Sequence, residues 1–254
     1  MIDKRTCRPL LLAAALTRAG QAVLRAAPPG GRARWERSNH AGRAVGLYAG
    51  PAVTVGAGIA AARVHPAAGA AVLAAGACGA YDDVAGDHRR GFRAHLRALR
   101  HGEITSGAVK LFGISAAGLA AGAVLKERPA DKLLAGIVIA GSAHLVNLLD
   151  VRPGRAAGAV LALGAPGLVR EGPGARLAAG AMGAAAAVLP DDVGERVMLG
   201  DTGAHALGAA LGAALGAAVV AGNRRAGLLA HAVALVAAAC CGDRVSALAR
   251  TLPG

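Results

Sequence analysis

The sequence predicts an all-α integral membrane protein, a polytopic helical bundle of about nine (8–10) transmembrane helices. Hydrophobic residues make up 55% of the 254 residues, and charged residues only 17%. A mean hydropathy of +0.48 excludes both a disordered chain and an ordinary soluble domain. Thirty-eight glycines and very few aromatic residues indicate helices that pack closely through small side chains, as helices in lipid do.

Apolar segments recur along the whole chain at the spacing of membrane spans, which need about 20 residues each. We place them at 9–24, 44–62, 66–81, 107–125, 132–149, 156–170, 175–190, 203–222 and 226–241. A basic start before the first segment is also typical of a signal peptide, but Arg18 and Gln21 interrupt that segment and favour an uncleaved helix. No Ser- or Pro-rich linker divides the chain, so residues 1–254 are predicted to form a single integral membrane domain.

The loops between these segments differ in basic charge. One set contains 25–43, 82–106, 150–155, 191–202 and the tail from 242, and the other contains 1–8, 63–65, 126–131, 171–174 and 223–225. The first set is the more basic, so the positive-inside rule places it in the cytoplasm and the N-terminus outside. Arg224 and Arg225 argue against this orientation. We therefore predict a multi-pass protein of the plasma (cytoplasmic) membrane.

The net charge of +13 indicates anionic partners. Short basic clusters between apolar stretches, with almost no aromatic residues to stack on bases, are not typical of nucleic-acid binding. Membrane lipid headgroups and phosphorylated substrates are the expected partners. Gly208, Gly212 and Gly216 recur every four residues and predict a glycine ridge that packs closely on a neighbouring helix, although chance spacing is an alternative.

Acidic residues are scarce, and the first cluster follows an apolar segment in GAYDDVAGDHRRGF. Asp82 and Asp83 are adjacent, and Asp87 lies four residues further on. Carboxylates crowded at a membrane edge repel one another unless a cation neutralises them, and magnesium held with substrate phosphates is the natural cation. The alternative is a solvated helix end with Arg89 and Arg90 as counter-ions.

Two further polar clusters follow later apolar segments. In HLVNLLDVRPGRA, Asn147 and Asp150 are three residues apart on one helical face, which suggests a functional pair. The alternative is that Asp150 only pairs with a following arginine in the loop. In MLGDTGAHALG, Asp201 lies in a glycine-rich turn and Thr202 can cap the next helix, a start that favours phosphate but also occurs in ordinary helices. Because all three clusters are predicted on one side, one polar site could collect them.

The series GAYDDVAGD, ITSGAVKLFG, NLLDVRPGRA and MLGDTGAHALG resembles the polyprenyl-phosphate sugar-1-phosphate transferases. This family includes phospho-N-acetylmuramoyl-pentapeptide transferase and undecaprenyl-phosphate N-acetylglucosamine-1-phosphate transferase. The resemblance runs from about Asn39 to the C-terminus. It implies transfer of a sugar 1-phosphate from a UDP-sugar to a polyprenyl phosphate (undecaprenyl or decaprenyl) on the cytoplasmic face, with release of UMP, for cell-envelope glycan synthesis.

The resemblance also assigns catalytic roles to residues of this sequence. Asp82, Asp83 and Asp201 would be catalytic, with Asp82 and Asp201 at a magnesium ion and Asp83 near the attacking lipid phosphate. Lys110 would contact phosphate, and Arg43 would add positive charge. Phosphoryl transfer mainly requires positioning and neutralisation of charge, which such residues supply.

The substrate-binding residues implied by the resemblance show where this chain diverges. Asn147 and Asp150 would line the nucleotide pocket. In the family this element continues into a glycine-rich stretch with a second Asp, whereas here Val-Arg-Pro-Gly-Arg follows, and the family's histidine-rich loop is absent. Arg152 and Arg155 would then meet phosphate in place of the lost groups. Related enzymes often form homodimers, and the Gly208 ridge would allow one.

Two other interpretations remain open at this point. A non-catalytic relative could bind polyprenyl phosphate or act as a scaffold for an envelope-synthesis complex, in which case the aspartates would serve folding and not turnover. A transporter would require inverted repeats and a charged site at the membrane midplane, and neither pattern is visible in the sequence.

Overall fold

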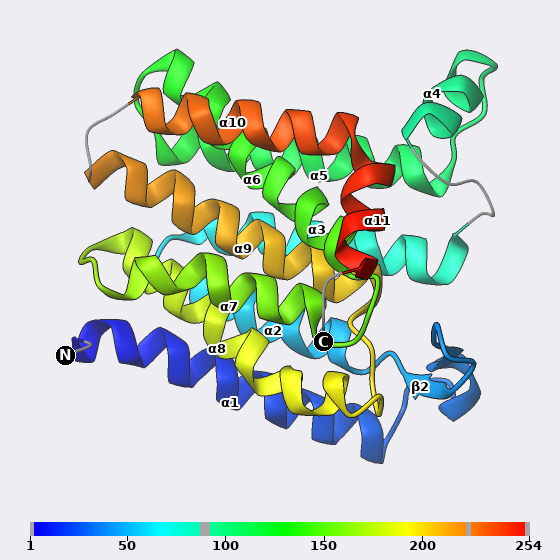
Figure 1. Cartoon of the computed structure of the whole chain (residues 1–254). Coiled ribbons are helices and arrows are strands. Elements are labelled where there is room, and N and C mark those ends of the chain that lie inside the picture. Colours follow the sequence, from blue (N-terminus) through cyan, green and yellow to red (C-terminus); the bar gives the residue numbers. More distant parts are fainter. Residues whose placement is uncertain (1–2, 87–91, 222–224, 252–254) are drawn as a thin grey trace.

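The computed structural model describes residues 3–86, 92–221 and 225–251. Within these ranges the chain is nearly all α-helical, with one small hairpin (Figure 1). The elements in order are α1 (Lys4–Ala26), the 3-10 helix η1 (Arg32–Arg34), β1 (Glu36–Ser38), β2 (Ala44–Gly46), α2 (Ala49–Ala62), α3 (Pro66–Ala85), α4 (Phe92–Arg100), α5 (Ser106–Leu125), α6 (Pro129–Leu149), α7 (Arg155–Leu168), α8 (Pro173–Val193), α9 (Gly200–Ala221), α10 (Arg225–Cys240) and α11 (Gly242–Thr251).

The predicted apolar segments coincide with helices. Each of the nine overlaps one helix, in the order α1, α2, α3, α5, α6, α7, α8, α9 and α10, so the prediction of a helical fold is confirmed within the described ranges, which are nearly all-α. The second segment starts too early, because β2 occupies its first residues and α2 begins only at Ala49. The short helices α4 and α11 and the hairpin were not predicted.

The number of membrane spans differs from the prediction. In the part of the chain that the structure describes, only α5 and α6 are long and apolar enough to cross a membrane, with a third span if α10 and α11, bent by 87°, count as one. About nine transmembrane helices are therefore not supported. Helices α2 and α7 have 14 residues each, about 21 Å at 1.5 Å per residue against a hydrocarbon core of about 30 Å. Alanine and glycine in the other helices contribute little hydropathy.

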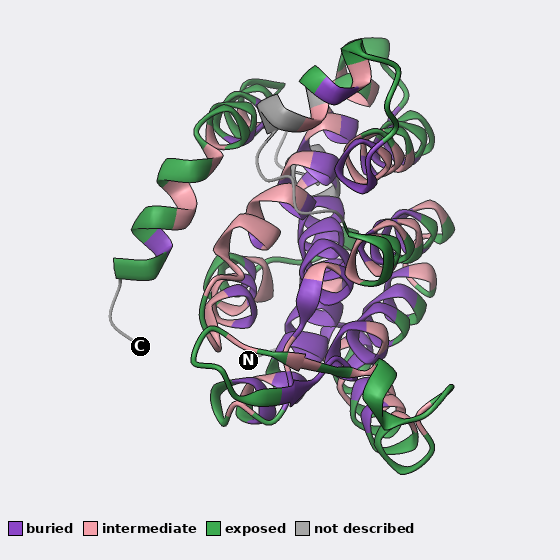
Figure 2. Ribbon diagram, turned by 90° about the vertical axis from the view of Figure 1, so that its right-hand side faces the viewer, coloured by how far each residue is buried: buried purple, intermediate pink, exposed green. Residues whose placement is uncertain are grey.

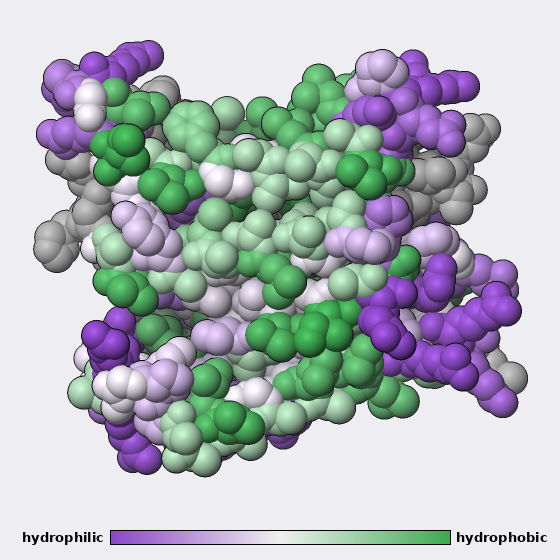
Figure 3. Space-filling model, turned by 180° about the vertical axis from the view of Figure 1, so that it is seen from behind, coloured by the Kyte–Doolittle hydropathy of each residue, from purple (hydrophilic) through white to green (hydrophobic). Residues whose placement is uncertain are grey.

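Large apolar side chains nevertheless cover much of the bundle's outer surface. Exposed examples are Val55 and Ile59 of α2, Leu119 of α5, and Leu229 and Val233 of α10. Figure 3 shows a broad hydrophobic band between hydrophilic regions at the two ends of the bundle. An exposed apolar surface of this extent is typical of contact with lipid or another protein, and with α5 and α6 it indicates membrane association.

Helix α9 forms the centre of the bundle, where buried residues concentrate (Figure 2). The predicted glycine ridge does pack closely: a Cβ on Gly208 or Gly212 would collide with the α6 backbone at Ser142, Ala143 or Ile139. The ridge therefore meets a helix of the same chain. It is not open for a second copy, so the predicted homodimer finds no support at this face.

The polar connections gather at one end of the bundle, on the right of Figure 1. The hairpin, the C-terminal ends of α3, α6 and α8, the start of α9, and α11 all lie there. The loops predicted to share one membrane side thus share one end of the fold. Which side of a membrane this end faces stays a prediction.

Local sequence explains how this end is built. Strands β1 and β2 pair antiparallel, with Arg37 opposite Val45, and Gly46 then forms a parallel bridge to Val197 in the loop before α9. Gly200 begins α9 with φ +60°, a conformation that glycine adopts without strain. The hairpin and the start of α9 are therefore held together by backbone pairing.

Candidate functional site

Three helices bring one cation and two carboxylates to a single point at the polar end. Lys110 of α5 donates from Nζ to Asp82 Oδ2 of α3 at 2.8 Å, and also to Asp201 Oδ2 at the start of α9. Their side chains are 18%, 21% and 25% exposed, respectively, so the group is mostly shielded but open to solvent. The group as a whole carries one excess negative charge when all three are ionised.

Asp83, the neighbour of Asp82, fastens the start of α9. Its Oδ1 accepts from the Asp201 backbone N–H at 3.0 Å, and its Oδ2 accepts from the Thr202 N–H at 3.0 Å and the Thr202 hydroxyl at 2.6 Å. A carboxylate at a helix N-terminus satisfies N–H groups that have no partner within the helix. Asp83 therefore positions Asp201. Its predicted place near a lipid phosphate stays a prediction.

Close backbone approach makes this arrangement possible. A Cβ on Gly79 of α3 would collide with the backbone at Asp201 and Thr202. A side chain at Gly200 would come within 2.9 Å of Asp83 Oδ2. The two glycines thus allow α3 and α9 to meet at their polar ends. Gly200 belongs to the glycine-rich turn that the sequence indicated, whereas no sequence pattern singled out Gly79.

Two histidines lie behind the cluster. His205 of α9 is fully buried, and its Nδ1 is 2.7 Å from the Asp201 carbonyl oxygen. Its ring meets that of His144 of α6 edge to face, with centroids 5.5 Å apart. Neither Nε2 has a hydrogen-bond partner among the described residues. Sequence analysis did not single out this pair, because only the fold brings the two helices together.

A second aspartate pair lies at the C-terminal end of α8. Asp191 accepts from Arg18 Nη1 at 2.9 Å and from Arg196 Nε at 2.7 Å. Asp192 is buried, and its Oδ2 accepts from the backbone N–H of Gly154 before α7, at 2.8 Å. The signal that could have revealed this pair is the same as for Asp82 and Asp83: two aspartates that end an apolar segment.

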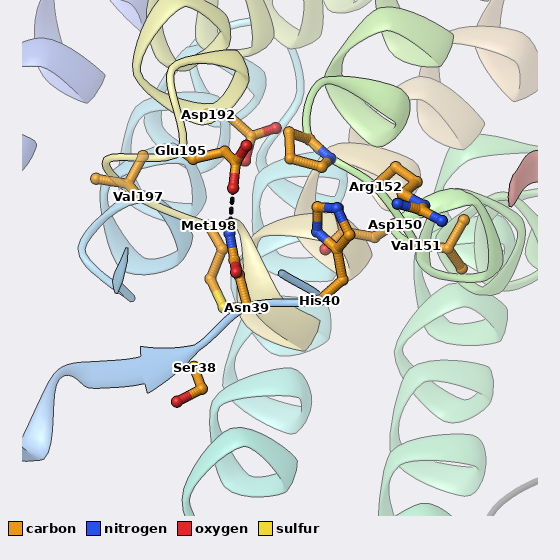
Figure 4. Close-up of a pocket in the computed structure, with 11 residues that line it drawn as sticks. Ser38, Asn39, His40, Asp150, Val151, Arg152, Asp192, Glu195, Val197 and Met198 are labelled. Carbon is orange, nitrogen blue, oxygen red and sulfur yellow. Dashed lines mark hydrogen bonds between the residues drawn. The ribbon is translucent and has the colours of Figure 1, made fainter. Parts of the chain in front are cut away.

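Other predicted binding residues surround a neighbouring cavity of about 170 Å³. The hairpin turn 38–40, the loop 150–153 and residues 192–198 supply its lining. Asp150 and Arg152 belong to this lining (Figure 4). Asn147, one turn earlier on α6, and Arg155, the first residue of α7, do not.

Glu195 connects the hairpin to the cavity wall. Its carboxylate accepts from Asn39 Nδ2 at 2.6 Å and pairs with Arg43 Nη1 at 3.1 Å. Glu195 has φ +51°, a left-handed conformation that is uncommon for a residue with a side chain. Arg43, predicted to add positive charge at the phosphates, is an exposed side chain that pairs with Glu195 at the hairpin.

Three carboxylates line the cavity, those of Asp150, Asp192 and Glu195. Burial raises the pKa of the Asp150 carboxyl well above its usual range, and the charges of Asp192, Asp201 and Asp83 raise it further. The shift links Asp150 electrostatically to both aspartate pairs. Asp82, Lys110 and Asp201 are not in the lining, but Met198, which lines the cavity, is only three residues before Asp201, so the cavity lies near the cluster.

The predicted magnesium site depends on which donor side chains come together. Within 3–86, 92–221 and 225–251, no three or more His, Cys, Asp or Glu side chains form a group that could hold a metal ion. Asp82 and Asp201 alone converge, and they do so on the Lys110 ammonium. Two carboxylates completed by substrate phosphates are a usual donor set for Mg²⁺, so these two residues fit the ion as a partial site. Asp87, Arg89 and Arg90 lie outside the described residues.

No protein-family model matches this chain, and the comparison with curated proteins gives no match. The resemblance to the sugar-1-phosphate transferases thus rests on the four sequence motifs. The activity that it implies is accordingly a proposal.

Proposed function

We propose that the protein is a magnesium-dependent membrane transferase. It would move a sugar 1-phosphate from a UDP-sugar to a polyprenyl phosphate and release UMP. The observation that carries this proposal is the convergence of Asp82, Lys110 and Asp201, from three different helices, beside a polar cavity. Buried charge is expensive, and a structural ion pair needs only one carboxylate, so a lysine shared by two suggests a site for charged ligands.

The proposed reaction is a single displacement at phosphorus. An oxygen of the polyprenyl phosphate attacks the β-phosphorus of the donor and forms a new P–O bond. The bond between that phosphorus and the bridging oxygen breaks, and the electron pair leaves with UMP. Such a reaction needs in-line positioning and neutralisation of charge more than covalent help from the protein.

The residues of the cluster would divide this work. Asp82 and Asp201 would hold Mg²⁺, which when bound neutralises charge on the donor diphosphate. Lys110 would present its ammonium to a phosphate oxygen. Asp83 would act indirectly, because its bonds to the Asp201 and Thr202 N–H groups fix the orientation of Asp201.

The membrane setting supports a lipid acceptor. The apolar band around the bundle would lie in the bilayer, and the polar end with the cluster would face the cytoplasm of a multi-pass plasma-membrane protein. A lipid phosphate at the interface could then reach the cluster from the bilayer while a UDP-sugar arrives from water.

The test is UMP release by the detergent-purified full chain with undecaprenyl phosphate and a panel of UDP-sugars, with and without magnesium. Magnesium-dependent release from at least one donor is the expected result. No release from any donor, by protein that is folded and binds lipid phosphate, would contradict the proposal.

The second candidate is a non-catalytic relative that binds polyprenyl phosphate or serves as a scaffold for an envelope-synthesis complex. The observation that favours it is the Lys110 bridge, which joins the two carboxylates without a metal. In that case Asp201→Asn would change stability, and lipid-phosphate binding would persist without turnover.

A further inference from the structure

The cavity beside the cluster has a shape and a lining that the proposed function leaves unexplained. Its volume is about 170 Å³, smaller than the several hundred Å³ of a typical site for a drug-sized ligand. Three separate segments enclose it: the hairpin turn, the loop after α6, and the end of α8 with the loop before α9. A space of this size holds one ring-sized group.

The lining offers hydrogen bonds in several directions. Figure 4 shows the His40 ring extending from the hairpin turn toward the side formed by Asp150 and Arg152, with Asp192 and Glu195 on the other side. Glu195 is occupied by Asn39 and Arg43, and Asp192 by Gly154. Among the described residues, the side chains of His40, Asp150 and Arg152 have no hydrogen bond or ion pair.

The lining argues against a nucleobase. No Phe, Tyr or Trp is among the described residues that line the cavity, so a base would lack the aromatic surface on which proteins commonly stack it. Carboxylate, imidazole and guanidinium groups instead match hydroxyls, which both donate and accept hydrogen bonds. A hydroxylated ring therefore fits the lining better than a planar base does.

The charged side chains of the lining further restrict which ligands the cavity can accept. Three carboxylates line the cavity, those of Asp150, Asp192 and Glu195, and Asp192 is only 3% exposed. A carboxylate on the ligand would add another negative charge beside Asp192 and Glu195, which like-charge repulsion disfavours. Arg152 is exposed and is the one arginine among the described residues that line the cavity.

We propose that this cavity recognises the sugar of the donor, and that it accepts a single ring without negative charge and without a large substituent. The inference rests on the proposed transferase function and specifies its substrate class. The neighbouring Asp82–Lys110–Asp201 cluster would hold the diphosphate, while His40, Asp150 and Arg152 would contact the sugar hydroxyls. Uronic acids and peptide-bearing sugars would be excluded, the first by charge and the second by size.

The test compares kcat/KM for UDP-N-acetylglucosamine, UDP-glucose, UDP-glucuronic acid and UDP-N-acetylmuramoyl-pentapeptide, together with equilibrium binding of UDP and of each donor. His40→Trp fills the cavity from the hairpin. Ala41→Trp is the matched control, because Ala41 is an exposed neighbour outside the lining. Asp192→Asn tests the charge, because Asp192 lines the cavity and Asn keeps an acceptor for the Gly154 N–H.

We expect kcat/KM for UDP-N-acetylglucosamine or UDP-glucose to exceed the values for UDP-glucuronic acid and UDP-N-acetylmuramoyl-pentapeptide by about tenfold or more. His40→Trp should abolish the affinity that the sugar adds over UDP while leaving UDP binding intact, and Ala41→Trp should change neither. Asp192→Asn should narrow the discrimination against UDP-glucuronic acid.

Two results would overturn the inference while leaving the transferase in place: equal effects of His40→Trp and Ala41→Trp, or preferred turnover of the uronic acid or the peptide-bearing donor. Absence of UMP release from every donor by the folded wild-type protein would overturn the proposed function, and the inference with it.

Discussion

Two aspartate pairs end two helices at the same end of the bundle, Asp82–Asp83 on α3 and Asp191–Asp192 on α8. In both, the first carboxylate binds a basic side chain, and the second accepts a backbone N–H at the start of another helix. The difference is in the balance of charge. Lys110 is shared between two carboxylates, whereas Asp191 alone receives Arg18 and Arg196.

This difference separates a structural clasp from a site for chemistry. The Asp191 cluster has an excess of positive charge, and its carboxylate joins α1 to the end of α8. The Asp82 cluster has an excess of negative charge that a divalent cation could satisfy. The same dipeptide at a helix end therefore fulfils two roles, and the basic partners decide which.

The largest contrast is expected in turnover. Asp201→Asn should lower kcat for UMP release by about 100-fold or more, because it removes one of the two proposed metal ligands. Asp191→Asn, with the same loss of one charge, should stay within about threefold. Steady-state assays on protein with wild-type circular dichroism would measure both. Similar losses in the two variants would remove the functional distinction between the clusters.

The next largest effect is expected in the free energy of unfolding when the basic side chain of each cluster is removed. Lys110→Met leaves Asp82 and Asp201 facing each other and should destabilise the metal-free protein by about 2–3 kcal/mol, since a mostly buried pair loses one member. Arg18→Met should cost about 1 kcal/mol or less, because Arg18 is half exposed and Arg196 remains on Asp191. Denaturation followed by fluorescence would compare them.

Magnesium should act on the two variants differently. It should raise the melting temperature of Lys110→Met more than that of the wild type, because the cation can take the place of the ammonium. Arg18→Met should respond as the wild type does. Equal magnesium responses in all three proteins would indicate that Asp82 and Asp201 do not bind the ion.

Substitution of the second aspartate of each pair should produce a smaller difference in stability between the two clusters. Asp83→Ala removes the acceptor for two backbone N–H groups and one hydroxyl and should cost about 2 kcal/mol. Asp192→Ala removes the acceptor for one N–H and should cost about 1 kcal/mol. If Asp83→Ala loses turnover at unchanged stability, its carboxylate acts on substrate and not as a cap.

The smallest effect is a pH dependence at Asp150. Its pKa is raised in the folded protein, so the unfolded chain ionises first as pH increases. Stability from this group is complete below the unfolded pKa and is lost as pH rises through the folded pKa. The melting temperature of the wild type should therefore fall more between pH 5 and pH 8 than that of Asp150→Asn. Parallel curves for the two proteins would refute this.

Local patterns in the sequence were enough to predict nine of the α-helices and the grouping of polar loops, although the short helices α4 and α11 were missed. Apolar segments and their turns are short-range features, so each of the nine segments overlaps a helix. The number of spans was overestimated, because alanine and glycine form helices in this bundle without giving them high hydropathy. The hairpin was missed, since its strands have three residues each and its pairing to Val197 is long-range.

The site was predictable only in part. The motifs singled out Asp82, Lys110 and Asp201, but Lys110 and Asp201 are 91 residues apart, and no local pattern states that they form an ion pair. The roles of Asp83 at the start of α9 and of Asp192 before α7 likewise depend on how helices meet. Arg43, expected at the phosphates, pairs with Glu195 in the hairpin region because that carboxylate is the one within reach.

The most direct test of the central claim is transfer of label from a UDP-sugar carrying ³²P in its β-phosphate to polyprenyl phosphate in proteoliposomes. The wild type and the matched variants Asp82→Asn and Asp191→Asn would be compared at equal amounts of folded protein. The account predicts magnesium-dependent labelling of the lipid by the wild type and Asp191→Asn, and a near-complete loss in Asp82→Asn. Labelling that persists in Asp82→Asn, or its absence in the wild type with every donor, would contradict it.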